Sequence, residues 1–401
     1  MMRGCPTILR RVPQLFGILL IGFLCVHLII IVSRREIQNA ILDKRTPLPE
    51  TAERGYREEP GEFIPVPPRT NMTKCHHPYG RVKVFIGARE ESFKEHYHVA
   101  HQTLKCYLKG ADYELLLVDI YNDPRVTSKC SHHHDIMYHR HCALLQYLNE
   151  TDWMLVMDAD TGVVNPAHCI EEFIDPRVDF IFYERFFNLE VMAGNWLVRN
   201  TPFARRVIQD WANWEFRRPN LPFGTNDNCI LHMVILEHLY NETAPQAVQM
   251  CDRIWRAHSK DYWSYIGSLV FCAKTMFGAN RFWPGKFKIQ PKGQGFARDA
   301  FLTNQRFTDR DFLFHGWKQM TIGEQGWQSP FTEVPELSKC GPGRMDGWHH
   351  RPNSRISDEE ALKDFLAIEA RFNNEVPKDF RLTPWLTESE LKDCYPNCQK
   401  V

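Results

Sequence analysis

The chain has 401 residues, of which 43% are hydrophobic, and its 49 basic and 49 acidic side chains give a formal net charge of zero. The apolar content suffices for a folded core, and the length fits one large α/β domain or about two to three smaller ones. Because the charges balance, no overall field attracts nucleic acid or an anionic surface, and a nucleic-acid-binding protein is not expected.

An apolar segment at residues 15–32 is the first strong feature of the chain. It contains no charged residue, and its length suffices to cross a bilayer as a helix. The bulky and then basic residues after it, Ile31 to Arg35, lack the small side chains of a signal-peptide cleavage site. Residues 15–32 are therefore predicted to be an uncleaved transmembrane signal anchor, preceded by a cytosolic tail at residues 1–14.

Cysteines and glycosylation sequons indicate the compartment, because basic residues on both sides of the anchor leave its orientation open. Of the 13 cysteines, 11 follow the anchor. Such a density favours an oxidising lumen with several disulfides, and the odd number leaves a thiol free or bonded to another chain, as in a disulfide-linked homodimer. Asn-x-Ser/Thr sequons at Asn71, Asn149 and Asn241 favour the same compartment. We expect a single-pass type II protein of the Golgi or ER membrane; a cytosolic protein with reduced cysteines is the alternative.

Residues 33–74 are predicted to form a stem between the anchor and the folded part. Six prolines between Pro47 and Pro68 interrupt any helix, and the segment has little apolar periodicity. This composition is typical of an extended linker. The remaining residues, 75–401, are expected to form the lumenal domain together with a C-terminal extension.

From residue 81 onward, short apolar runs alternate with segments of helical spacing. Strands are predicted at residues 82–86, 115–118 and 153–157, and helices at residues 93–108 and 137–148. This order is typical of an α/β sheet with crossover helices. Open sheets of this kind bind ligands at the carboxyl ends of their strands, and the third strand runs directly into Asp158, Ala159 and Asp160.

Asp158 and Asp160 are the best candidates for a metal site. Two carboxylates separated by one small residue can turn their oxygens toward a single hard cation, which suits Mg²⁺ or Mn²⁺. Such a cation can bridge the phosphates of a nucleotide sugar and neutralise the charge of a departing diphosphate. Acidic pairs after strands also serve as turn formers or helix caps, which is the structural alternative.

Residues 158–166, Asp-Ala-Asp-Thr-Gly-Val-Val-Asn-Pro, resemble the metal-binding segment of GT-A glycosyltransferases, in particular glycosyltransferase family 34. That family includes fungal α-galactosyl- and α-mannosyltransferases and plant xyloglucan xylosyltransferases, and nematodes carry similar type II membrane proteins. Further matches follow in the family's order at residues 193–200, 211–214, 226–228 and 314–316. The resemblance spans about residues 80–320 and implies a GT-A fold, a Rossmann-like mixed sheet flanked by helices.

The resemblance implies roles for His315 and Asp227. His315 would be a third metal ligand beside the two aspartates, or else a structural histidine. Asp227 would be the catalytic carboxylate near the anomeric carbon of the donor sugar. Alternatively, Asp227 caps a helix at residues 229–239. Asn228 stands where the family has Gln, which puts the contact with the acceptor in doubt.

Five further residues are predicted to bind the nucleotide sugar. Gly87, Ala88 and Arg89 follow the first strand, where Gly permits close approach and Arg89 can reach a phosphate or the base. Arg140 would approach the diphosphate from the helix before the metal loop, and Lys318 would do so from beyond His315. An ordinary turn and solvent-exposed basic side chains are the alternatives.

Two other sets of residues are given structural roles. The histidines around residues 132–141 lack the paired cysteines of a zinc finger, so zinc is not expected. Cys394 and Cys398 do not form a Cys-x-x-Cys motif and are expected to staple the C-terminal tail.

The resulting hypothesis is a Mn²⁺- or Mg²⁺-dependent glycosyltransferase that moves a sugar from a nucleotide-diphosphate donor to a glycan, glycoprotein or glycolipid acceptor. The family resemblance implies that the anomeric configuration is retained. An inverting GT-A enzyme, with a carboxylate as general base, is one alternative. A catalytically inactive, membrane-tethered glycan-binding protein of the same fold is the other.

Overall fold

The computed structural model of the protein describes residues 75–318, 329–342, 344, 346–377, 389, 391, 392 and 394–397. All of them belong to one unit of the chain, Thr51–Val401. The predicted tail, anchor and stem lie outside the described residues. Within the described part, no helix combines the length and the apolar character needed to cross a membrane.

Seven strands form the central sheet, in the spatial order β2 (Glu114–Asp119), β1 (Val82–Ala88), β3 (Trp153–Val156), β6 (Trp196–Arg199), β5 (Phe180–Tyr183), β8 (Phe287–Gln290) and β7 (Phe282–Trp283). Strands β2, β1 and β3 are parallel, whereas β6 runs antiparallel between β3 and β5. Strand β8 is parallel to β5, and β7 is antiparallel to β8. The three predicted strands and the mixed α/β sheet are therefore confirmed.

Helices α3 (His98–Ala111) and α5 (Ile136–Leu145) connect the three parallel strands, as the sequence predicts. The predicted helix at residues 93–108 is interrupted, because α2 (Glu90–Glu95) ends before α3 begins. A helix that was not predicted, α4 (Pro124–Cys130), starts where the Asp123 side chain accepts hydrogen bonds from the backbone N–H groups of residues 125 and 126. Proline is tolerated in that first turn because its missing N–H has no partner within the helix.

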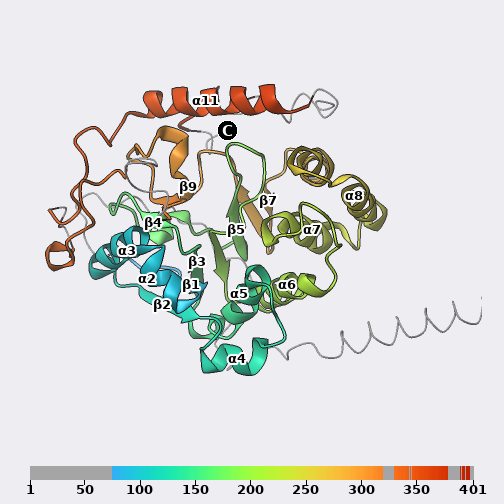
Figure 1. Ribbon diagram of the computed structural model, residues 1–401, viewed down its shortest axis with the longest axis horizontal. Coiled ribbons are helices and arrows are strands. Elements are labelled where there is room, and N and C mark those ends of the chain that lie inside the picture. Colours follow the sequence, from blue (N-terminus) through green and yellow to red (C-terminus); the bar gives the residue numbers. More distant parts are fainter. Residues whose placement is uncertain are drawn as a thin grey trace, which may run out of the picture. The chain divides into compact units, whose positions relative to one another are not determined.

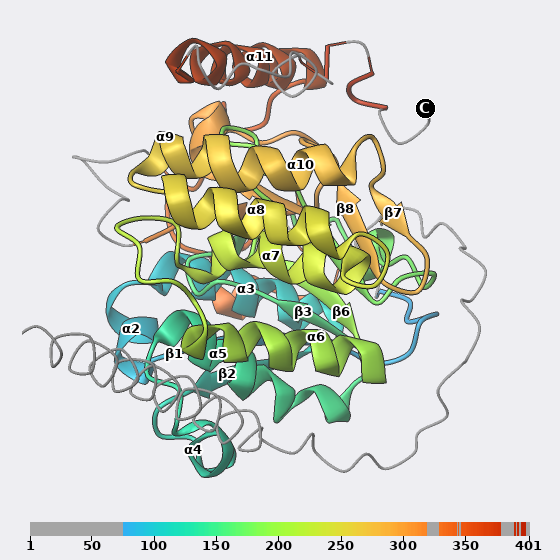
Figure 2. The same cartoon turned by 90° about the vertical axis from the view of Figure 1, so that its right-hand side faces the viewer.

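Helices lie on both faces of the central sheet. One layer contains α5 and four helices from the middle of the chain, which lie side by side in Figure 2: α6 (Pro202–Asn213), α7 (Asp227–Tyr240), α8 (Pro245–His258) and α10 (Phe271–Phe277). Helices α2 and α3 lie on the opposite side (Figure 1). Helix α11 (Asp358–Glu375) is the longest helix of the described chain. The other described helices are short connections: η1 (Leu148–Glu150), η2 (Ile170–Phe173), η3 (Trp214–Phe216), α9 (Tyr262–Tyr265), η4 (Ile266–Val270), η5 (Ala300–Thr303) and η7 (Leu337–Lys339).

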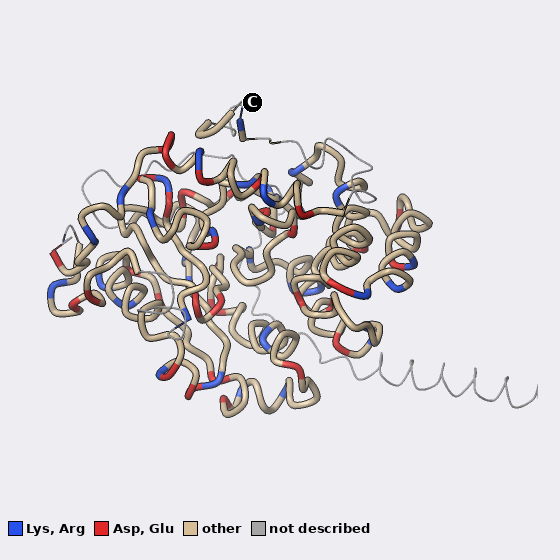
Figure 3. The backbone as a smooth tube through the Cα atoms, turned by 45° about the horizontal axis from the view of Figure 1, so that its top comes forward, with Lys and Arg blue, Asp and Glu red and all other residues tan. Residues whose placement is uncertain are grey.

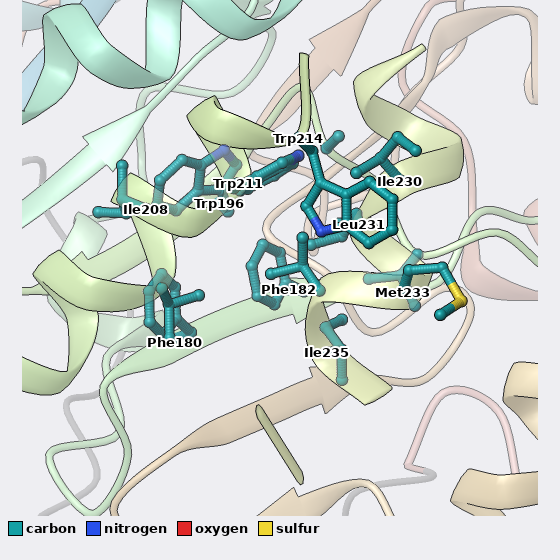
Figure 4. Packing of buried hydrophobic residues seen from close by; sticks show 14 of the residues in the cluster. Phe180, Phe182, Trp196, Ile208, Trp211, Trp214, Ile230, Leu231, Met233 and Ile235 are labelled. Atoms are coloured by element: carbon teal, nitrogen blue, oxygen red, sulfur yellow. The ribbon is translucent and has the colours of Figure 1, made fainter. Parts of the chain in front are cut away.

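Side chains of β3 alternate between two hydrophobic cores. Met154 and Val156 belong to the core beneath α5 to α8, whereas Trp153 and Leu155 belong to the core beneath α3. Figure 4 shows part of the first core, where aromatic side chains from β5, β6 and α6 pack together. Burial of each such aromatic side chain contributes about 1.5–3 kcal/mol to stability. Strand β3 is thus packed from both faces, and Asp158 follows its last residue, Val156, by two positions.

A second sheet joins the loop after β3 to the C-terminal part of the domain. Its strands are β4 (Gly162–Val163), β10 (Leu313–His315) and β9 (Ala297–Asp299), with β10 antiparallel to β4 and parallel to β9. A Cβ atom on Gly162 would lie 2.6 Å from the Trp317 ring, so only glycine fits there. This small sheet brings His315 to the loop that carries the two aspartates.

Four disulfides lie in the described chain. Cys75–Cys169 and Cys106–Cys340 join residues 94 and 234 positions apart, whereas Cys130–Cys142 and Cys251–Cys272 close short loops. Cys394 is also disulfide-bonded, and Cys398 lies outside the described residues. Cys229 is a free thiol within the described part and is buried. The predictions of several disulfides and of one thiol left over are confirmed. Burial of Cys229 leaves it no access to a second chain.

Charged residues are spread through the described part of the chain, which also contains two of the three sequons. Figure 3 shows basic and acidic residues interspersed along the described chain. Asn241, at the end of α7, is exposed, whereas Asn149 is half-buried. Asn71 lies outside the described residues. Asn241 is thus the described sequon with an accessible side chain.

Candidate metal and nucleotide-sugar site

The three predicted metal ligands come together at the junction of the two sheets. Nε2 of His315 lies 3.6 Å from Oδ2 of Asp158 and 3.4 Å from Oδ1 of Asp160. One possible ligand atom from each residue lies within 4.8 Å of the other two. These separations suit donors that share one ion, because each donor would lie about 2.0–2.2 Å from it. Two carboxylate oxygens and an imidazole nitrogen are a donor set that fits Mn²⁺.

Backbone hydrogen bonds fix the loop that carries the aspartates. The N–H of Thr161 donates to the carbonyl of Asp158 at 3.0 Å, which closes a tight turn directly after β3. The carbonyl of Asp160 accepts from the N–H of Trp317 at 2.8 Å, which ties the turn to the segment after His315. Ala159 is half-buried and packs on the hydrophobic core beneath α3. Ala159 therefore serves as an apolar spacer between the two carboxylates.

Arg140 lies in the site, but in contact with carboxylates. Its guanidinium, on α5, donates hydrogen bonds to the side chains of both Asp158 and Asp227. Burial alone would raise the pKa of Asp158, yet the positive charge of Arg140 and the hydrogen bond with His315 hold that pKa below its usual value. The sequence predicted that Arg140 approaches the diphosphate. It did not indicate that Arg140 pairs with two aspartates.

Asp227 is the first residue of α7 and is buried. The alternative in which Asp227 caps this helix is wrong, because Asn226 is the N-cap and accepts a hydrogen bond from the N–H of Cys229 at 3.0 Å. Burial would raise the pKa of Asp227, but Arg140 and the neighbouring His141 lower it overall. His141 stacks on Trp211 with ring centroids 3.9 Å apart.

Asn228 and residues 193–195, which directly precede β6, hold the backbone beside Asp158. The side-chain oxygen of Asn228 accepts a hydrogen bond from the N–H of Ala193 at 2.8 Å. Two residues further on, Asn195 accepts from the N–H of Asp158 at 3.3 Å. Residues 193–195 carried part of the family resemblance, yet the sequence assigned them no role in the site. Their position shows that they hold the backbone around Asp158.

The charges around His315 oppose the effect of burial on its pKa. Burial lowers the pKa of His315, but the negative charge of Asp160 and hydrogen bonds with Asp158 and Asp299 raise it to about 10.

Asp299 and Tyr97 were not predicted as site residues. Burial, and then the charges of Asp160 and Asp158, raise the pKa of the Tyr97 hydroxyl.

The remaining predicted residues lie at the same edge of the sheet. Gly87 and Ala88 end β1, and the exposed Arg89 places its guanidinium 4.2 Å from the centre of the Tyr121 ring. Among the described residues, Gly87 and Ala88 pair with β2 and Arg89 contacts Tyr121, rather than the metal ligands. Lys318 is closer, with its Nζ 3.8 Å from Oδ2 of Asp160 and its side chain 51% exposed.

The fold and the site define an α/β protein in which two carboxylates and one imidazole, beyond the end of a central strand, could hold a divalent cation. The profile of a family described as "Protein of unknown function, DUF273" matches residues 104–328, more than half of the chain. The chain belongs to this family. The sequence matches none of the curated proteins with which it was compared. Membership of glycosyltransferase family 34 in particular stays a prediction.

Two solved structures show a limited similarity to the chain. One is a glycosyltransferase involved in glycosylation of the major capsid of PBCV-1, with 13% identity, a TM-score of 0.31, and coverage of 61% of this chain and 95% of that one. The other is the mannosyltransferase PcManGT from Pyrobaculum calidifontis in complex with GDP-Man and Mn²⁺, with 12% identity, a TM-score of 0.26, and coverage of 54% and 73%. At TM-scores of this size, neither protein supplies an argument about this chain.

Proposed function

We propose that this protein is a metal-dependent glycosyltransferase that transfers a sugar from a nucleotide-diphosphate donor to a glycan acceptor. The observation that carries the proposal is the convergence of Asp158, Asp160 and His315 at the junction of two sheets. The likeness of residues 158–166 and 314–316 to metal-binding segments of glycosyltransferase family 34 supports the same function. His315 is 155 and 157 positions from the two aspartates in the sequence, yet the fold brings its Nε2 to within 3.4 Å of one and 3.6 Å of the other.

Asp158, Asp160 and His315 would hold Mn²⁺ or Mg²⁺, which when bound neutralises charge on the departing diphosphate. Lys318 adds a positive charge beside Asp160 and is exposed enough to reach a phosphate. Arg140 contributes a second positive charge on the opposite side, next to Asp158. In this proposal, Arg89 with its stacked Tyr121 lies toward the nucleotide end of the donor.

Asp227 is proposed to stabilise positive charge at the anomeric carbon. During transfer the bond from that carbon to the diphosphate breaks and a bond to the acceptor oxygen forms. With retention, the acceptor proton passes to the departing phosphate oxygen, so no protein base is needed. The lowered pKa of Asp227 and its pairing with Arg140 make it a poor general base. Asp227 is therefore assigned to charge stabilisation, and retention is the reaction proposed.

We also propose the topology and location that the sequence indicates. A tail at residues 1–14, an anchor at 15–32 and a stem at 33–74 would hold the domain in the lumen of the Golgi or ER. The disulfides of the described part support an oxidising compartment. Exposure of the sequon at Asn241 is compatible with glycosylation there.

Donor hydrolysis tests the function. The purified protein is incubated with a panel of nucleotide sugars in Mn²⁺ or in EDTA, and released nucleotide is measured. Asp158→Asn and Asp160→Asn should each reduce turnover at least about 100-fold. Asp252→Asn, which changes an aspartate paired with Arg256 on α8, is the matched control and should keep full activity.

The outcomes separate the three hypotheses. Hydrolysis of no donor, together with binding of glycans, would favour the inactive glycan-binding protein. With an active enzyme and an acceptor, NMR of the product's anomeric proton distinguishes retention from inversion. An inverted product would remove the role given to Asp227 here.

A further inference from the structure

We propose that Asp299 is a positioning residue that fixes the imidazole of His315 in the orientation and tautomer needed to bind the divalent cation. This inference rests on the proposed metal site. It adds a residue that is not itself a ligand, because the ligand cluster among the described residues consists of Asp158, Asp160 and His315.

Strand register places the two side chains together. Strands β9 and β10 are parallel, and Asp299 is the residue directly paired with His315. Directly paired residues of neighbouring strands project from the same face of a sheet. Oδ1 of Asp299 accordingly lies 2.7 Å from Nδ1 of His315, a normal hydrogen-bond distance.

Arg185 holds Asp299 in this position. The Nη2 atom of Arg185 lies 3.0 Å from Oδ1 of Asp299, and its Nε lies 3.3 Å from Oδ2. A two-point contact between a guanidinium and a carboxylate fixes the plane of the carboxylate as well as its position. The same guanidinium lies 4.4 Å from the centre of the Phe187 ring, which restrains it further. Asp299 is only 5% exposed, so water does not compete strongly for it.

This contact decides which nitrogen of His315 is available. When Nδ1–H donates to Asp299, the lone pair of the neutral ring lies on Nε2. Nε2 is the atom that faces both Asp158 and Asp160. Without the carboxylate, the ring can rotate or take the other tautomer, and the third ligand is then lost for part of the time. Loss of such a partner typically weakens metal binding about 10- to 100-fold.

The test measures Mn²⁺ affinity by calorimetry on the purified protein without any nucleotide sugar. Asp299→Asn keeps the size of the side chain but removes its charge and presents an amide to Arg185. We expect Mn²⁺ to bind about 10- to 100-fold more weakly to this variant. In a His315→Ala background the same substitution should cause no further loss, because Asp299 acts through that ring. A merely structural role would weaken binding in both backgrounds.

Asp311→Asn is the matched control. Asp311 forms a similar two-point contact with Arg298 of β9 but does not touch His315. This variant should lose stability and keep its Mn²⁺ affinity. If Asp299→Asn does not fold, Arg185→Lys gives the second measurement, because it loosens Asp299 while keeping the positive charge. A loss of about 3- to 10-fold in Mn²⁺ affinity supports the inference.

The inference is overturned if Asp299→Asn binds Mn²⁺ with unchanged affinity. Where Arg185→Lys is used instead, the same result in that variant overturns it. A different result overturns the proposed function alone. In that case the wild-type protein binds Mn²⁺, Asp299→Asn binds it more weakly, and the wild-type protein hydrolyses no nucleotide sugar. A wild-type protein that does not bind Mn²⁺ overturns both.

Discussion

The α-carbon of Gly194 lies directly against the carboxylate of Asp158. A Cβ atom at Gly194 would overlap Oδ2 of Asp158 and would lie 2.5 Å from the terminal methyl of Met192. The contact arises because β6, which starts two residues later, pairs antiparallel with β3. The backbone just before β6 thus limits where the candidate ligand Asp158, just after β3, can place its carboxylate.

Gly194→Ala is therefore expected to displace Asp158. Because catalytic geometry tolerates little displacement, turnover should fall about 100-fold, with Mn²⁺ affinity reduced as well. Steady-state hydrolysis and calorimetry measure the two effects. Gly341→Ala is the control, since a Cβ there would lie no closer than 3.8 Å to its nearest neighbour. Normal turnover in Gly194→Ala would contradict the close approach to Asp158.

Arg140→Met tests whether Arg140 neutralises the acidic site when the metal is absent. Its removal takes the shared guanidinium from the half-buried Asp158 and the buried Asp227, and loss of such a partner typically costs about 3–5 kcal/mol. We expect this loss of unfolding free energy in EDTA and a much smaller loss in excess Mn²⁺, which supplies positive charge instead. Denaturant titrations under both conditions measure it. Equal losses in EDTA and Mn²⁺ would show that Arg140 acts independently of the cation.

The raised pKa of His315 predicts that Mn²⁺ binding releases a proton. With a pKa of about 10, the metal-free imidazole is protonated at neutral pH, and a metal ligand must give up the proton on Nε2. Mn²⁺ affinity should therefore rise about tenfold per pH unit from pH 7 to 9. The unfolding free energy of the metal-free protein depends on pH in the opposite direction. The raised pKa of His315 makes its full contribution to that free energy below about pH 6.5, and the contribution is lost as the pH rises through about 10.

Calorimetry in buffers of different ionisation enthalpy gives the number of protons released. His315→Gln, which cannot carry that proton, should release none and should show a flat pH dependence over the same range. A wild-type protein that releases no proton at pH 7.5 would contradict the protonated state of His315.

Asp179 offers a pH test away from the metal site. Burial raises its pKa to about 6, although the Thr201 hydroxyl donates a hydrogen bond to it. A carboxyl with a raised folded-state pKa contributes stability below about pH 4, and that contribution is lost as the pH rises to 6. At pH 7.5 the ionised group should cost about 1–3 kcal/mol.

Asp179→Asn should therefore raise the unfolding free energy at pH 7.5 by up to that amount, and by much less at pH 4. Denaturant titrations at the two pH values give the difference. Asp210→Asn, with a side chain that is 40% exposed, should change stability little at either pH. A destabilised Asp179→Asn protein at pH 7.5 would contradict the raised pKa.

Neighbouring residues with similar chemistry explain where sequence reasoning was wrong or incomplete. Asn226 and Asp227 are adjacent, and both are good helix caps. Only the backbone conformation decides between them, and it leaves Asn226 as the cap and turns Asp227 toward Arg140. The predicted helix at residues 93–108 has suitable periodicity throughout, yet the chain breaks it between α2 and α3.

The sequence by itself determined the strands around residues 82–86, 115–118 and 153–157, the mixed α/β class and the candidate ligands Asp158, Asp160 and His315. These features depend on local apolar periodicity or on residue order, which a linear chain displays directly. The tertiary structure alone decided that Arg140 joins two aspartates, that Asp299 and Arg185 hold His315, and that Gly194 limits Asp158. Each of these is a contact between residues far apart in the chain, created only when strands and helices pack together.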